Sequence, residues 1–131
     1  MKIYFSIIEQ PVSRCGPKLY SEVEGIVSIL VDGRRVFGED GILLLELANQ
    51  LSRWLTTSET QNAGDFCYES MDFEDSPIIK FKHHSNGWII SSAWENGEFF
   101  VLNKVLISAV SDFLKALKLD LSKLAYVDDL F

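Results

Sequence analysis

The sequence predicts an α+β domain in two layers, an antiparallel sheet of five to six strands with two amphipathic helices packed on one face. Three observations predict it. Several short segments alternate apolar and polar residues, dipeptides ending in glycine join some of them as hairpins, and two longer segments repeat apolar residues every three or four positions. With 131 residues, the chain has the size of one domain spanning residues 1–131, and its core needs no disulfide or metal.

Alternation predicts the strands of the first half. Residues 3–8 place Ile3, Phe5 and Ile7 on one face of a first strand, and Pro11, Gly16 and Pro17 then favour a turn-rich connection. A hairpin is predicted over residues 22–37, with Asp32-Gly33 as a type I′ turn because both residues tolerate positive φ. Its inward-facing positions are expected to be Val23, Val27, Ile29 and Val31.

A helical period follows over residues 40–57, with Asp40 as the expected N-cap. Its apolar face is Leu44, Leu47, Ala48, Leu51, Trp54 and Leu55. Residues 58–65 form a polar loop, and three short strands are predicted at residues 66–70, 78–82 and 88–94. Asn86-Gly87 is the expected turn between the last two of these strands.

The second helix is predicted over residues 103–119, and a short tail covers residues 120–131. Its apolar positions are Leu106, Ala109, Val110, Phe113, Leu114 and Leu117. Because hairpin connections dominate and alternation of strands with helices is weak, the two helices are expected on one face of an antiparallel sheet.

The net charge limits the classes of partner that the protein is expected to bind. The 19 acidic and 12 basic residues give a net charge of −7, which argues against nucleic acid and against anionic membrane surfaces as partners. The apolar stretch at residues 3–8 is too short for a signal-peptide core, and no segment is long enough to span a membrane. We therefore expect a cytoplasmic protein whose two cysteines, Cys15 and Cys67, stay reduced.

The side chains most often used in catalysis form no recognisable site. His83 and His84 are adjacent at a strand end, so they point to opposite faces and do not converge on one atom or one metal. Cys67 alternates with aromatics, as a small core residue would. Zinc-ligand spacing, a phosphate-binding glycine loop and a nucleophile elbow are all absent, so no catalytic residue, metal or cofactor is predicted.

Tryptophans are expected in two roles. Trp54 and Trp88 occupy core phases of their predicted elements, so we expect them to be buried. Trp94 ends a strand beside Glu95, where an indole often serves as an interface anchor.

The most informative segment is acidic. Residues 65–75 hold five acids and no basic residue, and aromatic or apolar side chains are interleaved with them. Aromatics supply buried area and carboxylates supply steering, so this composition favours an interface with a basic protein. The alternative is that Phe66 and Tyr68 simply pack inward from a strand and that the acids form a solvated connection.

Several short motifs along the chain resemble a known class of protein. They are Arg53-Trp54-Leu55 at the end of a Leu-rich helix, Phe66-x-Tyr68-x-Ser70 leading into Asp72-x-Glu74, Pro77-Ile78-Ile79-x-Phe81, and Trp88-x-Ile90. From Met1 to Leu119 the chain resembles the small immunity proteins of bacterial toxin systems, including contact-dependent growth inhibition. The resemblance implies a bacterial protein that binds a cognate toxin domain tightly and blocks it without catalysis. Such proteins are commonly acidic when the toxin is a nuclease.

The expected binding surface joins the acidic segment to the end of a neighbouring hairpin. Its residues are Asp65, Glu69, Asp72, Glu74, Asp75, Trp94, Glu95 and Glu98. Two alternatives stay open. One is a regulatory domain that binds a small molecule or peptide in a pocket lined by Tyr4, Tyr68 and Trp94, and the other is a metal-free hydrolase that uses His83 or His84.

Overall fold

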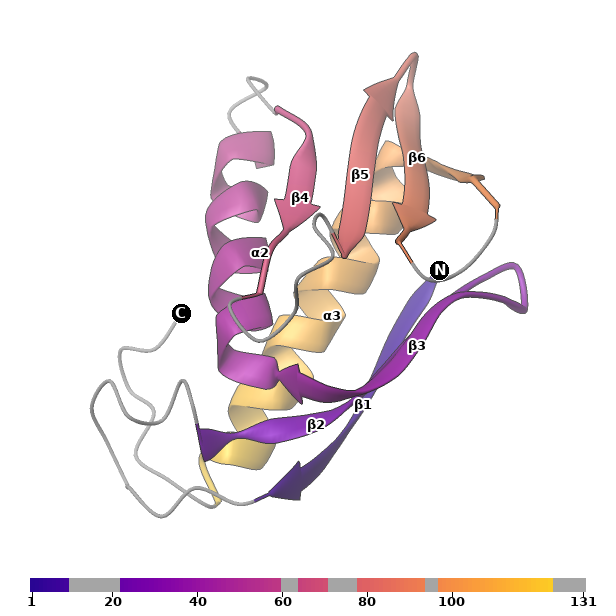
Figure 1. The fold of residues 1–131 in the computed structure, drawn as a ribbon. Coiled ribbons are helices and arrows are strands. Elements are labelled where there is room, and N and C mark those ends of the chain that lie inside the picture. The colour runs from indigo at the N-terminus through magenta and orange to yellow at the C-terminus, as the bar shows by residue number, and fades with distance from the viewer. Residues whose placement is uncertain (10–21, 60–63, 71–77, 94–96, 124–131) are drawn as a thin grey trace.

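The computed structural model of the chain describes residues 1–9, 22–59, 64–70, 78–93 and 97–123 (Figure 1). These residues form two antiparallel sheets and two long helices. The first sheet has the order β1 (Lys2–Glu9), β2 (Glu24–Val31), β3 (Arg34–Leu43). The second has the order β4 (Phe66–Tyr68), β5 (Ile79–His84), β6 (Gly87–Ser92), β7 (Phe99–Leu102).

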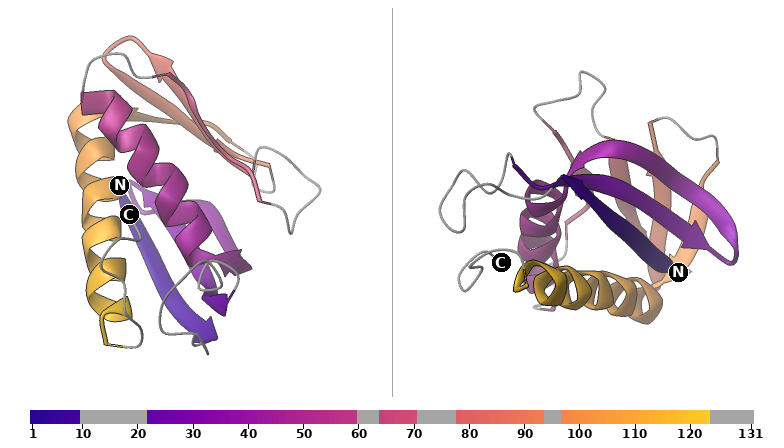
Figure 2. Two further views of the ribbon diagram at one scale, coloured as in Figure 1. Left: turned by 90° about the vertical axis from the view of Figure 1, so that its left-hand side faces the viewer. Right: turned by 90° about the horizontal axis from the view of Figure 1, so that it is seen from below.

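The helices are α2 (Leu44–Glu59) and α3 (Asn103–Leu121). They pack against each other, and both sheets lie on the same side of the pair (Figure 2). The predicted α+β class with antiparallel pairing and two amphipathic helices is confirmed, whereas the predicted single sheet is wrong. Alternation identified the strands, but the partner of each strand depends on how the chain returns after α2, which no local pattern encodes.

The predicted inward positions of the hairpin over residues 22–37 and of both helices are confirmed, although Leu55 is only partly buried. One cluster of buried hydrophobic side chains includes residues of both sheets and both helices, so the two sheets share a core. Trp54 of α2 packs against rings of the second sheet within this cluster, with ring-centroid distances of 6.0 Å to Phe66, 5.4 Å to Phe81 and 5.2 Å to Trp88. Both buried indoles donate hydrogen bonds, Trp54 to Gly64 O at 3.1 Å and Trp88 to Asn103 Oδ1 at 2.9 Å.

The first hairpin turns as predicted, because Asp32 and Gly33 have φ values of 51° and 78°, the positive values that a type I′ turn requires. The second hairpin is also present, but its turn was misplaced by one residue. Its turn residues are Ser85 and Asn86, with Ser85 at φ 56°, and Gly87 is the first residue of β6.

Asp40 does not cap α2, because β3 continues to Leu43 and the helix begins at Leu44. Asp40 and Gly41 together face Ile26, which makes a β-bulge, and Gly41 adopts a φ of 68° there. Pairing with β2 keeps the chain extended past the point where the helical period starts. β7 was missed as well, although buried Val101 alternates with exposed Phe100 and Leu102.

Candidate functional site

The candidate site is built around β4, the edge strand of the second sheet, which is held between β5 and α2. The Gln50 side chain hydrogen-bonds the backbone of Glu69 twice, donating to its O at 2.9 Å and accepting from its N–H at 3.3 Å. The Tyr68 hydroxyl donates to Glu46 Oε1 at 3.0 Å. Together with the bond from Trp54 to Gly64 O, these contacts attach the chain to one face of α2 on both sides of Cys67.

Phe66 and Tyr68 are buried, with 4% and 0% of their surfaces exposed, and therefore belong to the core. The alternative in which these two aromatics pack inward is confirmed, so they offer no ring to a partner. Cys67 is exposed, and its expected core position is wrong. Side chains of a strand alternate, so burial of both neighbours directs Cys67 outward.

Asp65 lies at one end of β4 and completes the hydrogen bonding of the neighbouring strand. Its Oδ1 accepts a hydrogen bond of 2.9 Å from the backbone N–H of His83. This N–H lies past the last residue pair of β4 and β5, Phe66 with Phe81, so the carboxylate takes the place of a missing backbone acceptor. The exposed Asp65 side chain therefore has a structural role that its charge alone did not indicate.

Glu69 and Glu98 are both exposed, but strand pairing places them at different levels of the sheet. Glu69 lies at the end where Tyr68 O bonds Ile78 N and Ile78 O bonds Ala93 N, whereas Glu98 precedes Phe99, which pairs with Ile90 in the row of Phe81 and Phe66. The strand order also separates Glu69 from Glu98 by three inter-strand spacings, roughly 14 Å. The other five predicted contact residues lie outside the described residues, namely Asp72, Glu74, Asp75, Trp94 and Glu95.

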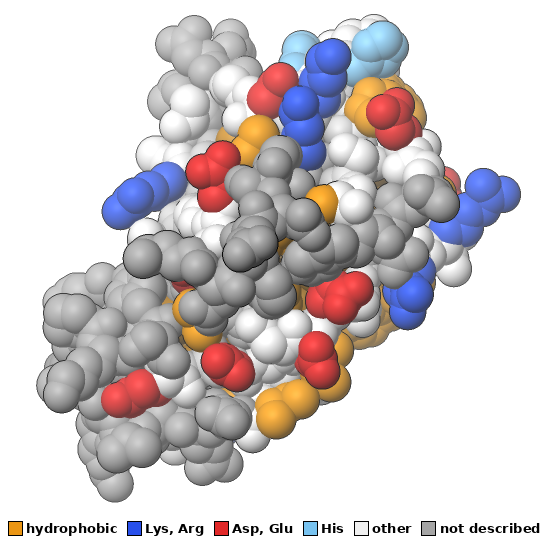
Figure 3. Space-filling model, in the orientation of Figure 1, with side chains coloured by type: hydrophobic (Ala, Val, Ile, Leu, Met, Phe, Trp, Pro, Cys, Tyr) orange, Lys and Arg blue, Asp and Glu red, His pale blue; other side chains and the backbone are white. Residues whose placement is uncertain are grey.

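A basic stripe, defined as Lys80, Lys82 and His84 of β5, runs beside β4 on the outer face of the second sheet. The three side chains line a hollow of about 400 Å³ together with Ile89, Ser91 and Glu98. In Figure 3, basic and histidine side chains gather over β5, whereas acidic side chains are scattered. The pairing of β4 with β5 thus places these cations beside the described first part of the acidic segment, residues 65–70.

The two histidines point to opposite faces, as predicted. The His83 ring lies 4.9 Å from Trp88 and the His84 ring 6.3 Å from Phe100, measured between centroids. Among the described residues, no group of three or more His, Cys, Asp or Glu side chains is placed to hold a metal ion.

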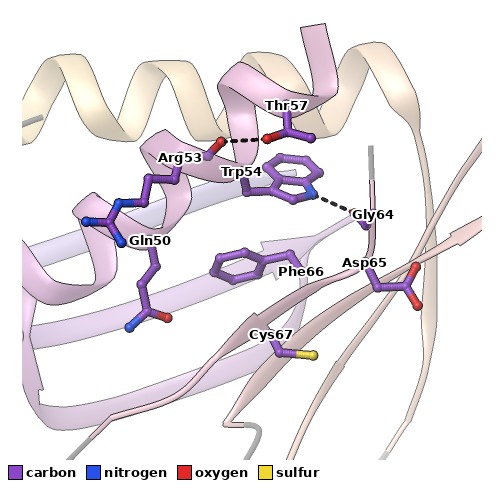
Figure 4. A pocket seen from close by; sticks show the side chains of 8 residues that line it. All are labelled: Gln50, Arg53, Trp54, Thr57, Gly64, Asp65, Phe66 and Cys67. Atoms are coloured by element: carbon purple, nitrogen blue, oxygen red, sulfur yellow. Dashed lines mark hydrogen bonds between the residues drawn. The ribbon is translucent and has the colours of Figure 1, made fainter. Parts of the chain in front are cut away.

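The pocket proposed for the regulatory alternative is not formed by its tyrosines. Tyr4 is 46% exposed on the outer face of β1, whereas Tyr68 is fully buried under β4, and Trp94 lies outside the described residues. A different hollow, here called the α2–β4 cleft, has a volume of about 350 Å³ (Figure 4). It is lined by Gln50, Arg53, Trp54, Thr57, Gly64, Asp65, Phe66 and Cys67.

Gln50, Arg53 and Thr57 lie outside the apolar face that the sequence predicts for this helix, but nothing in the local pattern indicates that β4 lies opposite them. Cys67 is predicted as a core residue. The lining of the cleft was therefore missed as a set, because it joins residues from two elements separated by a loop.

The family comparison covers nearly the whole fold. The family model for the domain of unknown function DUF7878 matches residues 6–123, which include the second half of β1 and all later elements through α3. The chain belongs to this family. The DUF7878 match covers both the α2–β4 cleft and the basic stripe, so both are features of the family's domain in this chain.

No curated protein and no solved structure matches this DUF7878 chain. Within the described residues, neither α2 nor α3 combines the length and apolar character that crossing a membrane requires.

Proposed function

We propose that the chain is an immunity protein that binds and neutralises a cognate toxin domain, a basic nuclease, without catalysis of its own. The binding surface is the acidic segment together with the neighbouring hairpin end: Asp65, Glu69, Asp72, Glu74, Asp75, Trp94, Glu95 and Glu98. The proposal locates the protein in the bacterial cytoplasm, where a nuclease toxin reaches its substrate. The motif resemblance supports this function, and the DUF7878 family match neither adds to it nor opposes it.

The observation that carries the proposal is the distribution of charge. The described residues hold thirteen acids against ten lysines and arginines, a net charge of −3. The remaining residues hold six acids against two basic residues and so carry −4 of the total of −7, and Asp72, Glu74 and Asp75 supply three of these acids within four positions. A nuclease must present a basic cleft to its substrate, so such a concentration of carboxylates attracts the toxin as phosphates would.

The anchoring of Glu69 supports this choice of surface. Its backbone is held to α2 by both hydrogen bonds of Gln50, while its carboxylate is exposed. The chain thus enters the acidic segment from a rigid position, which reduces the conformational entropy that binding would otherwise cost.

The first test is rescue in cells. The toxin domain to use is the variable C-terminal domain of a large secreted protein encoded immediately upstream, and co-expression of this chain should restore growth. Failure of the chain to rescue growth would count directly against the proposal.

The second test is a triple charge reversal of Asp72, Glu74 and Asp75 to lysine. Reversal should lower the association rate with that toxin domain by roughly tenfold or more and reduce the salt dependence of the rate, because steering acts on encounter. The matched control reverses Asp32, Asp112 and Asp120, which are exposed elsewhere, and should retain the larger part of the rate. Equal rates and equal salt dependence for the two triple variants would exclude this surface.

A further inference from the structure

We propose that the α2–β4 cleft binds the C-terminal end of an extended peptide, which adds a short strand to the edge of β4 and places its terminal carboxylate against Arg53. The site adjoins the acidic surface and shares Asp65 with it, but it selects the opposite charge through Arg53. The inference therefore does not depend on toxin binding.

The open edge of β4 is defined by its hydrogen bonds. Because Glu69 exchanges both backbone bonds with Gln50, its N–H and C=O point away from β5. Backbone groups of a strand alternate between its two edges, so Cys67, two residues earlier, presents its N–H and C=O to the same side. Phe66 and Tyr68 then supply the bonds to their β5 partners, Phe81 and Ile79. Cys67 accordingly offers one donor and one acceptor to an added strand, as edge strands generally do.

The cleft supplies the walls for such a strand. Gln50, Arg53 and Thr57 form one stripe along α2, and Trp54 and Phe66 lie between this stripe and Cys67 (Figure 4). A volume of about 350 Å³ is near the lower end of ligand pockets, which run from about 300 to 1,000 Å³. The Gln50 clamp on Glu69 obstructs the cleft at one end, so a chain that ends there fits better than one that passes through.

Charge selects the end of the chain. The Arg53 side chain is exposed, and among the described residues no carboxylate forms an ion pair with its guanidinium. The acid that lines the cleft, Asp65, is bonded to His83 N–H and points away from Arg53 (Figure 4). A guanidinium binds a carboxylate through two parallel hydrogen bonds, which adds specificity to strand pairing. Pairing of a peptide with an edge strand is an established mode of peptide recognition.

The test uses three N-acetylated tripeptides, one of valine, one of leucine and one of phenylalanine. Each is prepared with a free and with an amidated C-terminus and is added at millimolar concentration. On ¹⁵N-labelled protein, the free acids should shift the Cys67 amide and the Arg53 Nε–H resonances saturably. The amidated forms should bind roughly tenfold more weakly, because they lack the charge-assisted bonds. Absence of a saturable Cys67 shift with every free acid, or equal affinity for acid and amide, would overturn the proposal.

Two variants separate the parts of the site. Arg53→Gln should reduce free-acid affinity roughly tenfold, to the level of the amide, whereas the matched control Lys115→Gln, on the exposed face of α3, should change it less than about twofold. Cys67→Pro removes the edge donor without removing a bond to β5 and should abolish binding of both forms. If Cys67→Pro does not fold, Arg53→Gln decides, and unchanged affinity in that variant contradicts the site.

Discussion

At the scale of single residues, charged side chains carry structural roles that composition does not reveal. Asp65 was expected only as a partner contact, yet its carboxylate, just before the first residue of β4, accepts a hydrogen bond from the His83 N–H. Glu46 likewise accepts a hydrogen bond from the hydroxyl of Tyr68, so the polar group of this buried side chain has a carboxylate partner. These carboxylates thus serve as hydrogen-bond acceptors within the fold, whether or not a partner protein is bound.

This role of Asp65 predicts the effect of two substitutions. Asp65→Ala should lower the free energy of unfolding by about 0.5–1.5 kcal/mol, because the His83 N–H loses its acceptor. Asp65→Asn keeps a side-chain oxygen and should stay within about 0.5 kcal/mol of the parent. Urea denaturation measures both values. Equal stability of Asp65→Ala and the parent would show that the hydrogen bond contributes nothing.

At the scale of elements, close approach of backbones decides where glycine is required. A Cβ on Gly87 would lie 2.3 Å from the backbone oxygen of Val101 on β7 and 2.7 Å from the Phe100 ring. Gly64, in contrast, has no heavy atom within 4 Å of such a Cβ. Glycine is thus required at position 87 of the expected Asn86-Gly87 turn. The reason is the close packing of β7 against β6 and not a positive φ.

Three alanine substitutions separate these causes. Gly87→Ala should cost at least about 2 kcal/mol of unfolding free energy, because β6 and β7 must move apart. Gly33→Ala should cost about 1–2 kcal/mol through its φ of +78°, and Gly64→Ala should be nearly neutral. Chemical denaturation gives the order. A Gly87→Ala variant as stable as Gly64→Ala would contradict the close contact.

Whether an element could be predicted depended on how far apart in the sequence its interacting residues lie. The two helices and the inward positions of the first hairpin followed from local periodicity, because burial of one face imposes a repeat on the residues themselves, and the Asp32-Gly33 turn followed from its residue types. The end of β3 did not, since pairing with β2 overrode the helical period at residues 40–43. The α2–β4 cleft forms where two elements dock, and this contact imposes no repeating pattern on the sequence of either element.

At the scale of the whole molecule, one shared core joins two separate sheets. Trp54 contacts rings from β4, β5 and β6, and α3 packs against strands of both sheets. Unfolding of either sheet would expose apolar surface of the other, so the two should not unfold independently.

This arrangement predicts a single unfolding transition. Thermal or urea unfolding followed by far-UV circular dichroism and by tryptophan fluorescence should give coincident midpoints. A Trp94→Phe variant confines the fluorescence to Trp54 and Trp88, which are both buried in the shared core. Two separated transitions in that variant would show that the sheets are independent units.

The sequence by itself determined the α+β class, the antiparallel hairpins, the amphipathic helices and the local excess of acidic charge. Each of these depends on residues that are close along the chain. Only the tertiary structure decided that the strands divide into two sheets, that lysines of β5 lie beside β4, and that β4 docks on α2 to form a cleft with Arg53. These features require residues distant in sequence to meet, and the free energy that selects them belongs to the packed core as a whole.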